Sequence, residues 1–471
     1  MSRSICSRCL SQQLPSPRLF PAPFAEAAAF STSPSNSAAA NKKVVTKPGA
    51  RQGTTLRLSK NKREAGGRPP APGERKASRK KISLSNPNAL EVQGLQDLTK
   101  DYTTSARLAE VEGRVLGLQE QNVEALKALE AFKHTQGWRY FRKPATLVRR
   151  ETVELARAME EAEGSAEGTK RWVLCGEQGS GKSVLQLQAM VLAQQKGWVV
   201  VHLPDAQDIA IGHSSYAPSG DGRTYIQPHY TAALLSRIAV ANQEVLSKLE
   251  LSQSHDLPIP VQSNISLSRF AELGARDPEI AWPVYCALMA ELTTPSATRP
   301  PLLFTMDAID HIMRPSGYLD GDAKPLHSHD LAIVSHYLSF LSGSSPLPHG
   351  GMILAATTAS NRPKSPTLSH ILATQTKPQQ WDPHHGYTTS QTPTWDPYAP
   401  FDQRVADSLA GVEVKDIKGL SKDEAKGVME FYALSGMLRG EVTERLVGEK
   451  WTLSGGGVFG ELERGSVGMR V

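Results

Sequence analysis

Eight residues from Gly176 to Ser183 carry the clearest chemical signal in the sequence. They read Gly-Glu-Gln-Gly-Ser-Gly-Lys-Ser and match the phosphate-binding pattern G-x-x-x-x-G-K-S. In this pattern glycines let backbone N–H groups turn toward a phosphate, the lysine reaches the β- and γ-phosphates, and the last hydroxyl binds Mg²⁺. The sequence therefore predicts a site for ATP or GTP with Mg²⁺. The residues expected to form it are Gly176, Gln178, Gly179, Ser180, Gly181, Lys182 and Ser183.

A strand before this loop and a helix after it are needed to position it. The apolar run Trp-Val-Leu-Cys at residues 172–175 enters the loop directly, and residues 184–192 have the pattern of an amphipathic helix. Strand, loop and helix thus follow each other in the order that phosphate binding requires. The alternative is a Gly/Ser loop that precedes a lysine by chance.

Two later apolar runs end in polar residues that could complete the site. The run at residues 302–307 ends in Asp307, which we expect to be the metal-side carboxylate, and Asp310 is a second candidate for the metal. The run at residues 351–356 is followed by Thr357 and Thr358. These two threonines are candidates for sensing the γ-phosphate, although a plain transition from strand to turn would give the same pattern.

An aromatic and basic stretch, Trp-Arg-Tyr-Phe-Arg-Lys at residues 138–143, lies upstream of the loop. Many nucleotide-binding folds place a lid over the base there, so Tyr140 and Arg142 are candidates for contacts with the base or as part of a lid. The alternative is an anchor that packs against the domain.

Strands that alternate with helices predict an α/β fold with a doubly wound parallel sheet, as in P-loop NTPases of the AAA+ or STAND-like kind. We expect helices over residues 150–163, 229–251, 280–292 and 330–341, a last strand near 411–414, and long loops at 205–228 and 360–400. The predicted parts are a transit peptide (1–40), a basic disordered arm (41–88), an N-terminal helical segment (89–150), the P-loop domain (151–420) and a helical or mixed C-terminal module (421–471).

The start of the chain has the composition of a mitochondrial transit peptide, rich in Ser, Ala and Arg and poor in acids. A merely disordered N-terminus is the alternative. Between Lys42 and Lys81 there are 14 Lys or Arg residues against Glu64 and Glu74. Such a tract cannot bury enough apolar surface to fold alone, and its charge favours the phosphates of RNA or DNA. A solvated linker and contact with anionic lipid are the other readings.

The cations of this arm that we expect to contact RNA are Lys42, Lys43, Arg57, Lys60, Lys62, Arg63, Arg75, Lys76, Arg79, Lys80 and Lys81.

Catalytic residues are harder to assign than binding residues. ATPases of this kind usually carry a glutamate directly after the strand-end aspartate, and the chain has Ala308 there. The Asn-Lys-x-Asp signature that many GTPases use for guanine is not found after the loop, so the base stays open. We therefore assign no catalytic residue and expect nucleotide binding without efficient hydrolysis. No window has the roughly 20 apolar residues of a membrane span.

The order of these motifs resembles the death-associated protein 3 family, nucleotide-binding proteins of the small subunit of the mitochondrial ribosome. The resemblance covers residues 95–471 and includes the Pro-Tyr-Ala-Pro-Phe-Asp-Gln-Arg-Val segment at 397–405. It implies a location on the mitochondrial ribosome in the matrix, contacts with ribosomal RNA and ribosomal proteins, and a bound purine nucleotide, usually GTP. It also implies that residues 176–183 form the phosphate site, with Asp307 on the metal side.

A second hypothesis is an active mitochondrial AAA+-like NTPase that remodels a protein or nucleic-acid partner. The absence of the glutamate at position 308 favours the ribosomal hypothesis. The ribosomal hypothesis does not require a homo-oligomer.

Overall fold

The computed structural model describes residues 82–468, except 165–166, 221, 263, 296–298 and 377–394. The predicted transit peptide and all the named cations of the basic arm lie outside the described residues, so these two assignments stay predictions. Residues 82–88, which the sequence analysis groups with the arm, are described. Ile82 and Leu84 pack against the hydrophobic core, and the N–H of Asn86 donates to the carbonyl of Phe141 at 2.8 Å.

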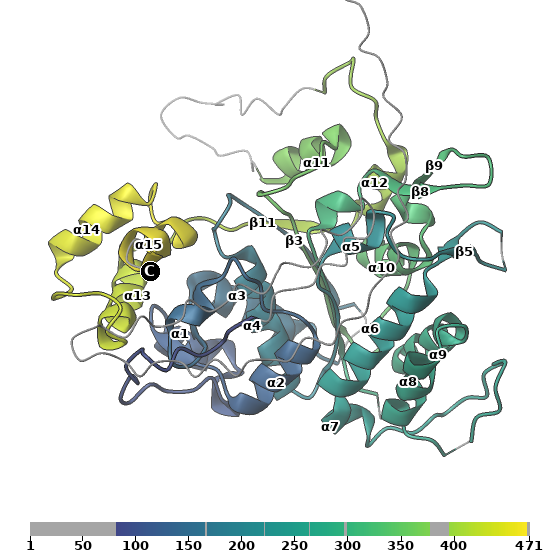
Figure 1. Cartoon of the computed structure of the whole chain (residues 1–471), viewed down its shortest axis with the longest axis horizontal. Helices are drawn as coiled ribbons and strands as arrows, with labels where there is room; N and C mark the ends of the chain where they lie inside the picture. The colour runs from purple at the N-terminus through teal and green to yellow at the C-terminus, as the bar shows by residue number, and fades with distance from the viewer. Residues whose placement is uncertain are drawn as a thin grey trace, which may run out of the picture. The chain divides into compact units, whose positions relative to one another are not determined.

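A parallel sheet of five strands lies at the centre of this part of the chain (Figure 1). Its order is β11 (Glu413–Asp416), β3 (Lys170–Cys175), β10 (Gly351–Ala356), β7 (Leu302–Asp307) and β4 (Val199–Leu203). All four neighbouring pairs are parallel. The carboxyl ends of the strands therefore meet at one edge of the sheet, and β10 separates β3 from β7.

Helices cover both faces of the sheet (Figure 1), which explains why its inner strands are continuously apolar. Successive side chains of a strand point to opposite faces. Val199 and Val201 accordingly belong to one hydrophobic core and Val200 to the other. The predicted α/β class, a parallel sheet flanked by helices, is confirmed in this form.

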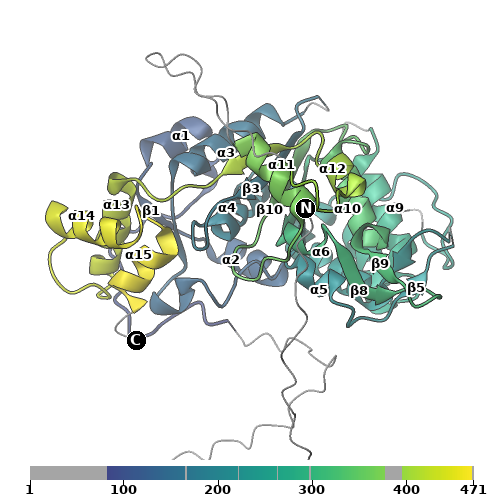
Figure 2. The ribbon, with the colours of Figure 1, turned by 90° about the horizontal axis from the view of Figure 1, so that it is seen from above.

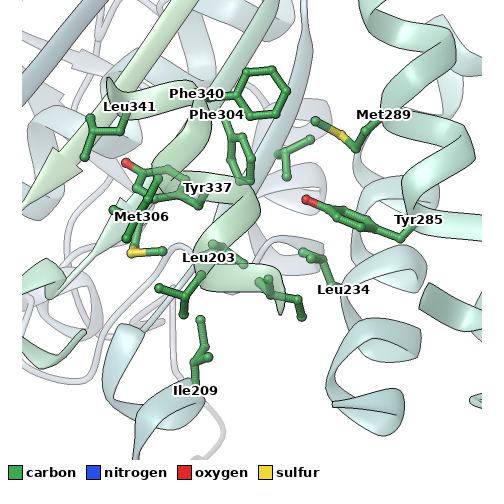
Figure 3. Close-up of a cluster of buried hydrophobic side chains, with 14 of the residues drawn as sticks. Leu203, Ile209, Leu234, Tyr285, Met289, Phe304, Met306, Tyr337, Phe340 and Leu341 are labelled. Atoms are coloured by element: carbon green, nitrogen blue, oxygen red, sulfur yellow. The ribbon is translucent and has the colours of Figure 1, made fainter. Parts of the chain in front are cut away.

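The larger hydrophobic core lies between one face of the sheet and helices that follow β4 in the chain. Phe304 and Met306 of β7 meet Tyr337 of α10 and Tyr285 of α9 there (Figure 3). The Phe304 and Tyr337 rings lie edge to face with centroids 4.9 Å apart. The helices on this face are α5 (Ala206–Ala210), α6 (Pro228–Ala241), α8 (Leu267–Arg276), α9 (Ala281–Thr293), α10 (Ala332–Ser342), α11 (Pro366–Thr376) and α12 (Gln403–Ser408).

The other face is covered by the N-terminal segment, which is only partly helical. It contains α1 (Ser105–Glu110), α2 (Glu120–Ala128) and α3 (Arg150–Glu161), and α4 (Lys182–Gln195) packs beside them. Between the helices, β1 (Val115–Gly117) pairs with β2 (Ala145–Leu147). Between α1 and β1, Gly113 has φ 79°, and its N–H donates to the carbonyl of Val148.

Three helices form the C-terminal module: α13 (Lys422–Leu434), α14 (Glu444–Leu453) and α15 (Phe459–Ser466). Ser421 and Glu424 form a reciprocal capping box at the start of α13. The module packs on the β1–β2 pair (Figure 2), where the ring of Phe141 stacks on Tyr432 at 5.4 Å. It therefore joins the N-terminal segment through a hydrophobic core of its own.

The predicted helix over residues 229–251 is shorter than expected. It ends at Asn242, whose side chain pairs with both backbone groups of Val200, at 2.7 and 2.8 Å. The rest of the predicted range contains the short helix α7 (Gln243–Leu246). The loop expected at 205–228 contains α5 and a two-stranded hairpin, and the described part of the loop expected at 360–400 contains α11.

The remaining short elements are the hairpin strands β5 (Ala217–Pro218) and β6 (Tyr225–Ile226), the hairpin β8 (Pro315–Leu319) and β9 (Pro325–His327), and the 3₁₀ turns η1 (Lys100–Tyr102), η2 (Gly137–Tyr140), η3 (Ile309–His311) and η4 (Ser328–Asp330). No helix within the described ranges is long and apolar enough to cross a membrane.

Candidate nucleotide-binding site

The glycine loop connects the end of β3 to the start of α4 at the carboxyl edge of the sheet. Gly176, Gly179 and Gly181 have φ values of 139°, 81° and 101°, a backbone region that residues with a side chain rarely adopt. A Cβ on Gly176 would also lie 2.5 Å from the carbonyl oxygen of Ile417. The loop therefore needs glycine at these positions for its conformation and for the close approach of a neighbouring segment.

Lys182 lies folded onto the loop that precedes it. Its Nζ donates to the carbonyls of Gly176 at 2.9 Å and Glu177 at 2.7 Å. Burial lowers the pKa of Lys182, while the nearby carboxylate of Asp307 acts in the opposite direction. The ammonium is thus held at the mouth of the loop, where a phosphate would compete with two carbonyl oxygens for it.

Asp307 ends β7 and faces the first turn of α4. Its Oδ2 accepts a hydrogen bond from the Ser183 hydroxyl at 2.7 Å, and its Oδ1 accepts one from the N–H of Ala308 at 2.7 Å. Oδ2 also accepts from the ammonium of Lys133. A hydroxyl and a carboxylate oxygen next to each other form the oxygen donor set that Mg²⁺ prefers, with phosphates and water filling its other positions. The residues present fit this ion.

Asp310 is arranged differently from Asp307. Its carboxylate is fully buried, and it accepts from Arg362 Nε at 2.8 Å through one oxygen and from the Thr358 N–H at 2.6 Å through the other. Burial raises the pKa of Asp310, and the two partners counteract it. Asp307 lines the cavity described below, whereas Asp310 is not among its lining residues. Asp307, rather than Asp310, therefore borders the cavity beside the glycine loop.

Thr357 and Thr358 follow β10, the strand between β3 and β7, and both line the cavity. The Thr357 hydroxyl donates to the carbonyl of Leu174 at 3.1 Å, so it is engaged with the neighbouring strand. This is the plain strand-to-turn arrangement that the sequence left open. Their candidacy as γ-phosphate sensors stays a prediction.

A cavity of about 960 Å³ extends from the glycine loop between the N-terminal segment and the C-terminal module. This volume lies in the range of small-molecule sites. Of the two candidates for a base or lid contact, Tyr140 lines this cavity and Arg142 does not, and the role itself stays a prediction. The Arg142 guanidinium donates to the carbonyl of Pro87 at 3.3 Å and borders a separate cavity of about 110 Å³. The two predicted contacts therefore border different cavities.

The C-terminal module contributes residues that the sequence analysis did not identify. The first turn of α15 contacts the loop, where the N–H of Gly460 donates to the carbonyl of Gly179 at 2.9 Å.

Arg149 also contacts the loop and was not identified from the sequence. It is buried at the start of α3 and donates to the carbonyls of Ser180 at 2.8 Å and Lys418 at 2.9 Å. Arg149 therefore connects the loop to the segment that follows β11.

Two residues that line the cavity away from the loop each have a buried polar atom without a hydrogen-bond partner among the described residues: Glu463 Oε1 and Gln136 Nε2. Burial raises the pKa of Glu463 to about 7, and Arg139 counteracts this shift. No local sequence pattern identifies them, because they come together only in the folded chain.

Fold and site define an α/β protein with helices on both faces of a parallel sheet and a glycine-rich loop at the carboxyl edge of that sheet. The sequence model of the "Mitochondrial ribosomal death-associated protein 3" family matches residues 146–465, and the chain belongs to this family. The resemblance noted in the sequence is therefore confirmed, and with it the location on the mitochondrial ribosome.

Two relatives extend this result. "Small ribosomal subunit protein mS29" of Neurospora crassa is 42% identical over 418 residues, which are 88% of this chain and 87% of the relative. The protein of the same name from Schizosaccharomyces pombe is 23% identical over 353 residues, or 73% of this chain and 69% of the relative. The chain is similar to both over most of their lengths.

Proposed function

We propose that this protein is a component of the small subunit of the mitochondrial ribosome that binds a purine nucleotide, ATP or GTP, with Mg²⁺. Both relatives carry the name of a small-subunit protein, which supports the ribosomal part. The nucleotide part rests on one observation above all. The Ser183 hydroxyl lies 2.7 Å from the Asp307 carboxylate beside a loop whose glycines have positive φ.

In this proposal the sheet domain is a P-loop domain of the AAA+ or STAND-like kind. The N–H groups of the loop and Lys182 hold the β- and γ-phosphates, and Ser183 and Asp307 hold Mg²⁺, which shields the charge of the phosphates. The base would lie toward Tyr140, on the side of the C-terminal module. Because the cavity lies between this module and the N-terminal segment, a bound nucleotide would stabilise their arrangement by mass action.

We further propose that binding occurs without efficient hydrolysis. Activation of water would need a carboxylate beside Asp307, and the next residue is Ala308. The nearest candidate, Asp310, has both oxygens engaged by Arg362 and the Thr358 N–H. An active NTPase remains the competing function, and steady turnover of added ATP or GTP would favour it.

The nucleotide proposal is tested by purifying the full chain, denaturing it and identifying the released nucleotide. The wild type should release close to one ATP or GTP per chain. Lys182→Ala should release almost none, because the cation at the phosphates is lost. Lys248→Ala is the matched control, since its side chain is exposed. Wild-type protein that retains no nucleotide and binds none when ATP or GTP is added with Mg²⁺ would refute the proposal.

Contact with ribosomal RNA and neighbouring proteins completes the proposed function, with the basic arm laid along RNA phosphates. Deletion of residues 42–81 should make the affinity for small-subunit RNA less dependent on salt, because fewer counterions are released on binding. An unchanged dependence would mean that the folded body, rather than the arm, contacts the RNA. Lys182→Ala should leave this dependence as in the wild type.

A further inference from the structure

Lys133 lies at the position where the candidate metal site is expected to hold its cation. Its ammonium contacts Oδ2 of Asp307, the same oxygen that accepts the Ser183 hydroxyl at 2.7 Å. The other oxygen of Asp307 is engaged by the N–H of Ala308. The carboxylate oxygen available to a metal is therefore shared by the hydroxyl and the ammonium.

The backbone at Lys133 is fixed, so the contact is more than the chance position of a long surface side chain. The N–H of Lys133 donates to Gln136 Oε1 at 2.8 Å, and the Gln136 N–H donates back to the carbonyl of Lys133 at 3.2 Å. Phe132, directly before it, is buried and packs edge to face on Trp138 at 5.3 Å. The turn thus directs the side chain toward a carboxylate that lies 174 residues further along the chain.

Burial explains why Asp307 needs a cation beside it. The Asp307 side chain is only 5% exposed, and an unpaired buried carboxylate is costly. Lys182, the other cation of the site, is engaged by the carbonyls of Gly176 and Glu177. Among the described residues, Lys133 is the cation that forms an ion pair with Asp307.

Mg²⁺ bound directly to Oδ2 would lie close to the Lys133 ammonium, and the two cations would repel each other. Direct binding of Mg²⁺ to Oδ2 together with a nucleotide would therefore displace Lys133. Lys133 lines the same cavity as the loop residues Gln178 to Ser183. The displaced ammonium would face the anionic end of the ligand, and the oxygens of the terminal phosphate are its natural new acceptors.

We infer that Lys133 is an exchangeable cation of the phosphate site. It pairs with Asp307 in the absence of Mg²⁺ and contacts the terminal phosphate once Mg²⁺ has replaced it. This inference rests on the proposed nucleotide binding. It adds that the N-terminal segment, through Lys133, helps to distinguish a triphosphate from a diphosphate. It also adds that Mg²⁺ competes with the Lys133 ammonium for Oδ2 of Asp307.

The test uses the full chain freed of nucleotide and the fluorescent N-methylanthraniloyl derivatives of ATP, ADP, GTP and GDP, titrated at a series of Mg²⁺ concentrations. In Lys133→Met the ammonium is removed and the length of the side chain is kept. The Mg²⁺ concentration for half-maximal binding should fall, because the competitor is gone. The preference for triphosphate over diphosphate should fall by about tenfold, the effect of one lost charge-assisted hydrogen bond.

Lys127→Met is the control, because Lys127 is a half-exposed lysine of the same segment that pairs with Glu124. Lys133→Arg, which keeps the charge, should stay close to the wild type in both measurements. Lys133→Gln replaces the methionine variant if that variant does not fold.

A folded Lys133→Met or Lys133→Gln protein that matches the wild type in both the Mg²⁺ requirement and the triphosphate preference would overturn the inference. Failure of the underlying function would look different, since the wild type would then bind none of the four derivatives at any Mg²⁺ concentration. Loss of binding in Lys182→Ala, with wild-type behaviour in Lys133→Met, would leave the nucleotide site standing and remove the role of Lys133.

Discussion

The N–H of Gly460 donates a hydrogen bond to the carbonyl of Gly179 at 2.9 Å, so the last helix of the chain begins against the glycine loop. A Cβ added to Gly179 would lie 3.3 Å from the Cα of Gly460, and one added to Gly460 would lie 3.2 Å from the Cα of Gly179. The two backbones touch without room for side chains between them. The C-terminal module is therefore part of the candidate site. A substitution in the loop should also change the stability of the module.

Gly179→Ala should lower both stability and nucleotide retention. The residue has φ 81°, a conformation that costs a residue with a Cβ about 1–2 kcal/mol, and the new methyl group would press on Gly460. The matched control is Gly448→Ala in α14, where a Cβ meets nothing within 4 Å and should stabilise the helix by about 0.5–1 kcal/mol. Urea unfolding measures both changes, and equal effects of the two substitutions would contradict the account.

Arg149 and Arg150 are neighbours with opposite expected importance. The Arg149 side chain is 9% exposed and donates to the carbonyls of Ser180 and Lys418, whereas that of Arg150 is 79% exposed and pairs with Glu154 on the helix surface. Arg149→Met should cost about 3 kcal/mol, because buried acceptors lose their charged donor. Arg150→Met should cost less than about 0.5 kcal/mol. Free energies of unfolding from urea titrations would test this, and a similar loss in both variants would disprove the bridging role of Arg149.

Glu463 should make stability depend on pH. Burial raises the pKa of this carboxyl to about 7 in the folded chain, so folding favours its protonated form. Below the ordinary pKa of glutamate the residue is neutral in both states and costs nothing. Stability should therefore fall as the pH rises from that value to about 7, by about 1.4 kcal/mol for each unit of pKa difference, less any screening by solvent.

Glu463→Gln removes this charge and should raise the unfolding temperature at pH 8 while leaving it nearly unchanged at pH 4. Glu461→Gln is the control, because Glu461 lies on the exposed side of the same helix and pairs with Arg464. Thermal unfolding at the two pH values measures the effect. A gain at pH 8 that is no larger for the Glu463 variant than for the Glu461 variant would show that the buried charge is not the cause.

Asn242 should stabilise the edge of the sheet. Its side chain donates to the carbonyl of Val200 and accepts from the N–H of the same residue, as a neighbouring strand would. Asn242→Ala would leave both buried backbone groups unpaired, at a cost of about 2–4 kcal/mol. The exposed Asn361 provides the control, and its replacement by alanine should have little effect. Amide hydrogen exchange at Val200 should accelerate only in Asn242→Ala, and unchanged protection would rule out this role.

The sequence predicts best what depends on neighbouring residues. The strand, loop and helix around Lys182 follow from a local pattern, and the strand that ends in Asp307 follows from an apolar run. Ser421 and Glu424 likewise reveal their cap by spacing alone. Each of these features depends on about ten neighbouring residues. For this reason the strands of the sheet and the glycine loop could be predicted from the sequence alone.

Contacts between distant segments could not be predicted in this way. The partner of Lys133 lies 174 residues away, and the carbonyl of Lys418 that Arg149 reaches lies 269 residues away. Asn242 ends a helix whose apolar pattern continues beyond it, because a bond to β4 outweighs the local preference. The predicted length of that helix was wrong because of this contact with β4.

The most direct test of the account is to isolate the protein from mitochondria at moderate salt, follow its sedimentation, and identify the nucleotide released on denaturation. We predict that it migrates with the small ribosomal subunit and releases about one intact ATP or GTP per chain. Sedimentation as a free protein that carries a diphosphate, together with steady turnover of added triphosphate, would contradict the account and indicate an active NTPase.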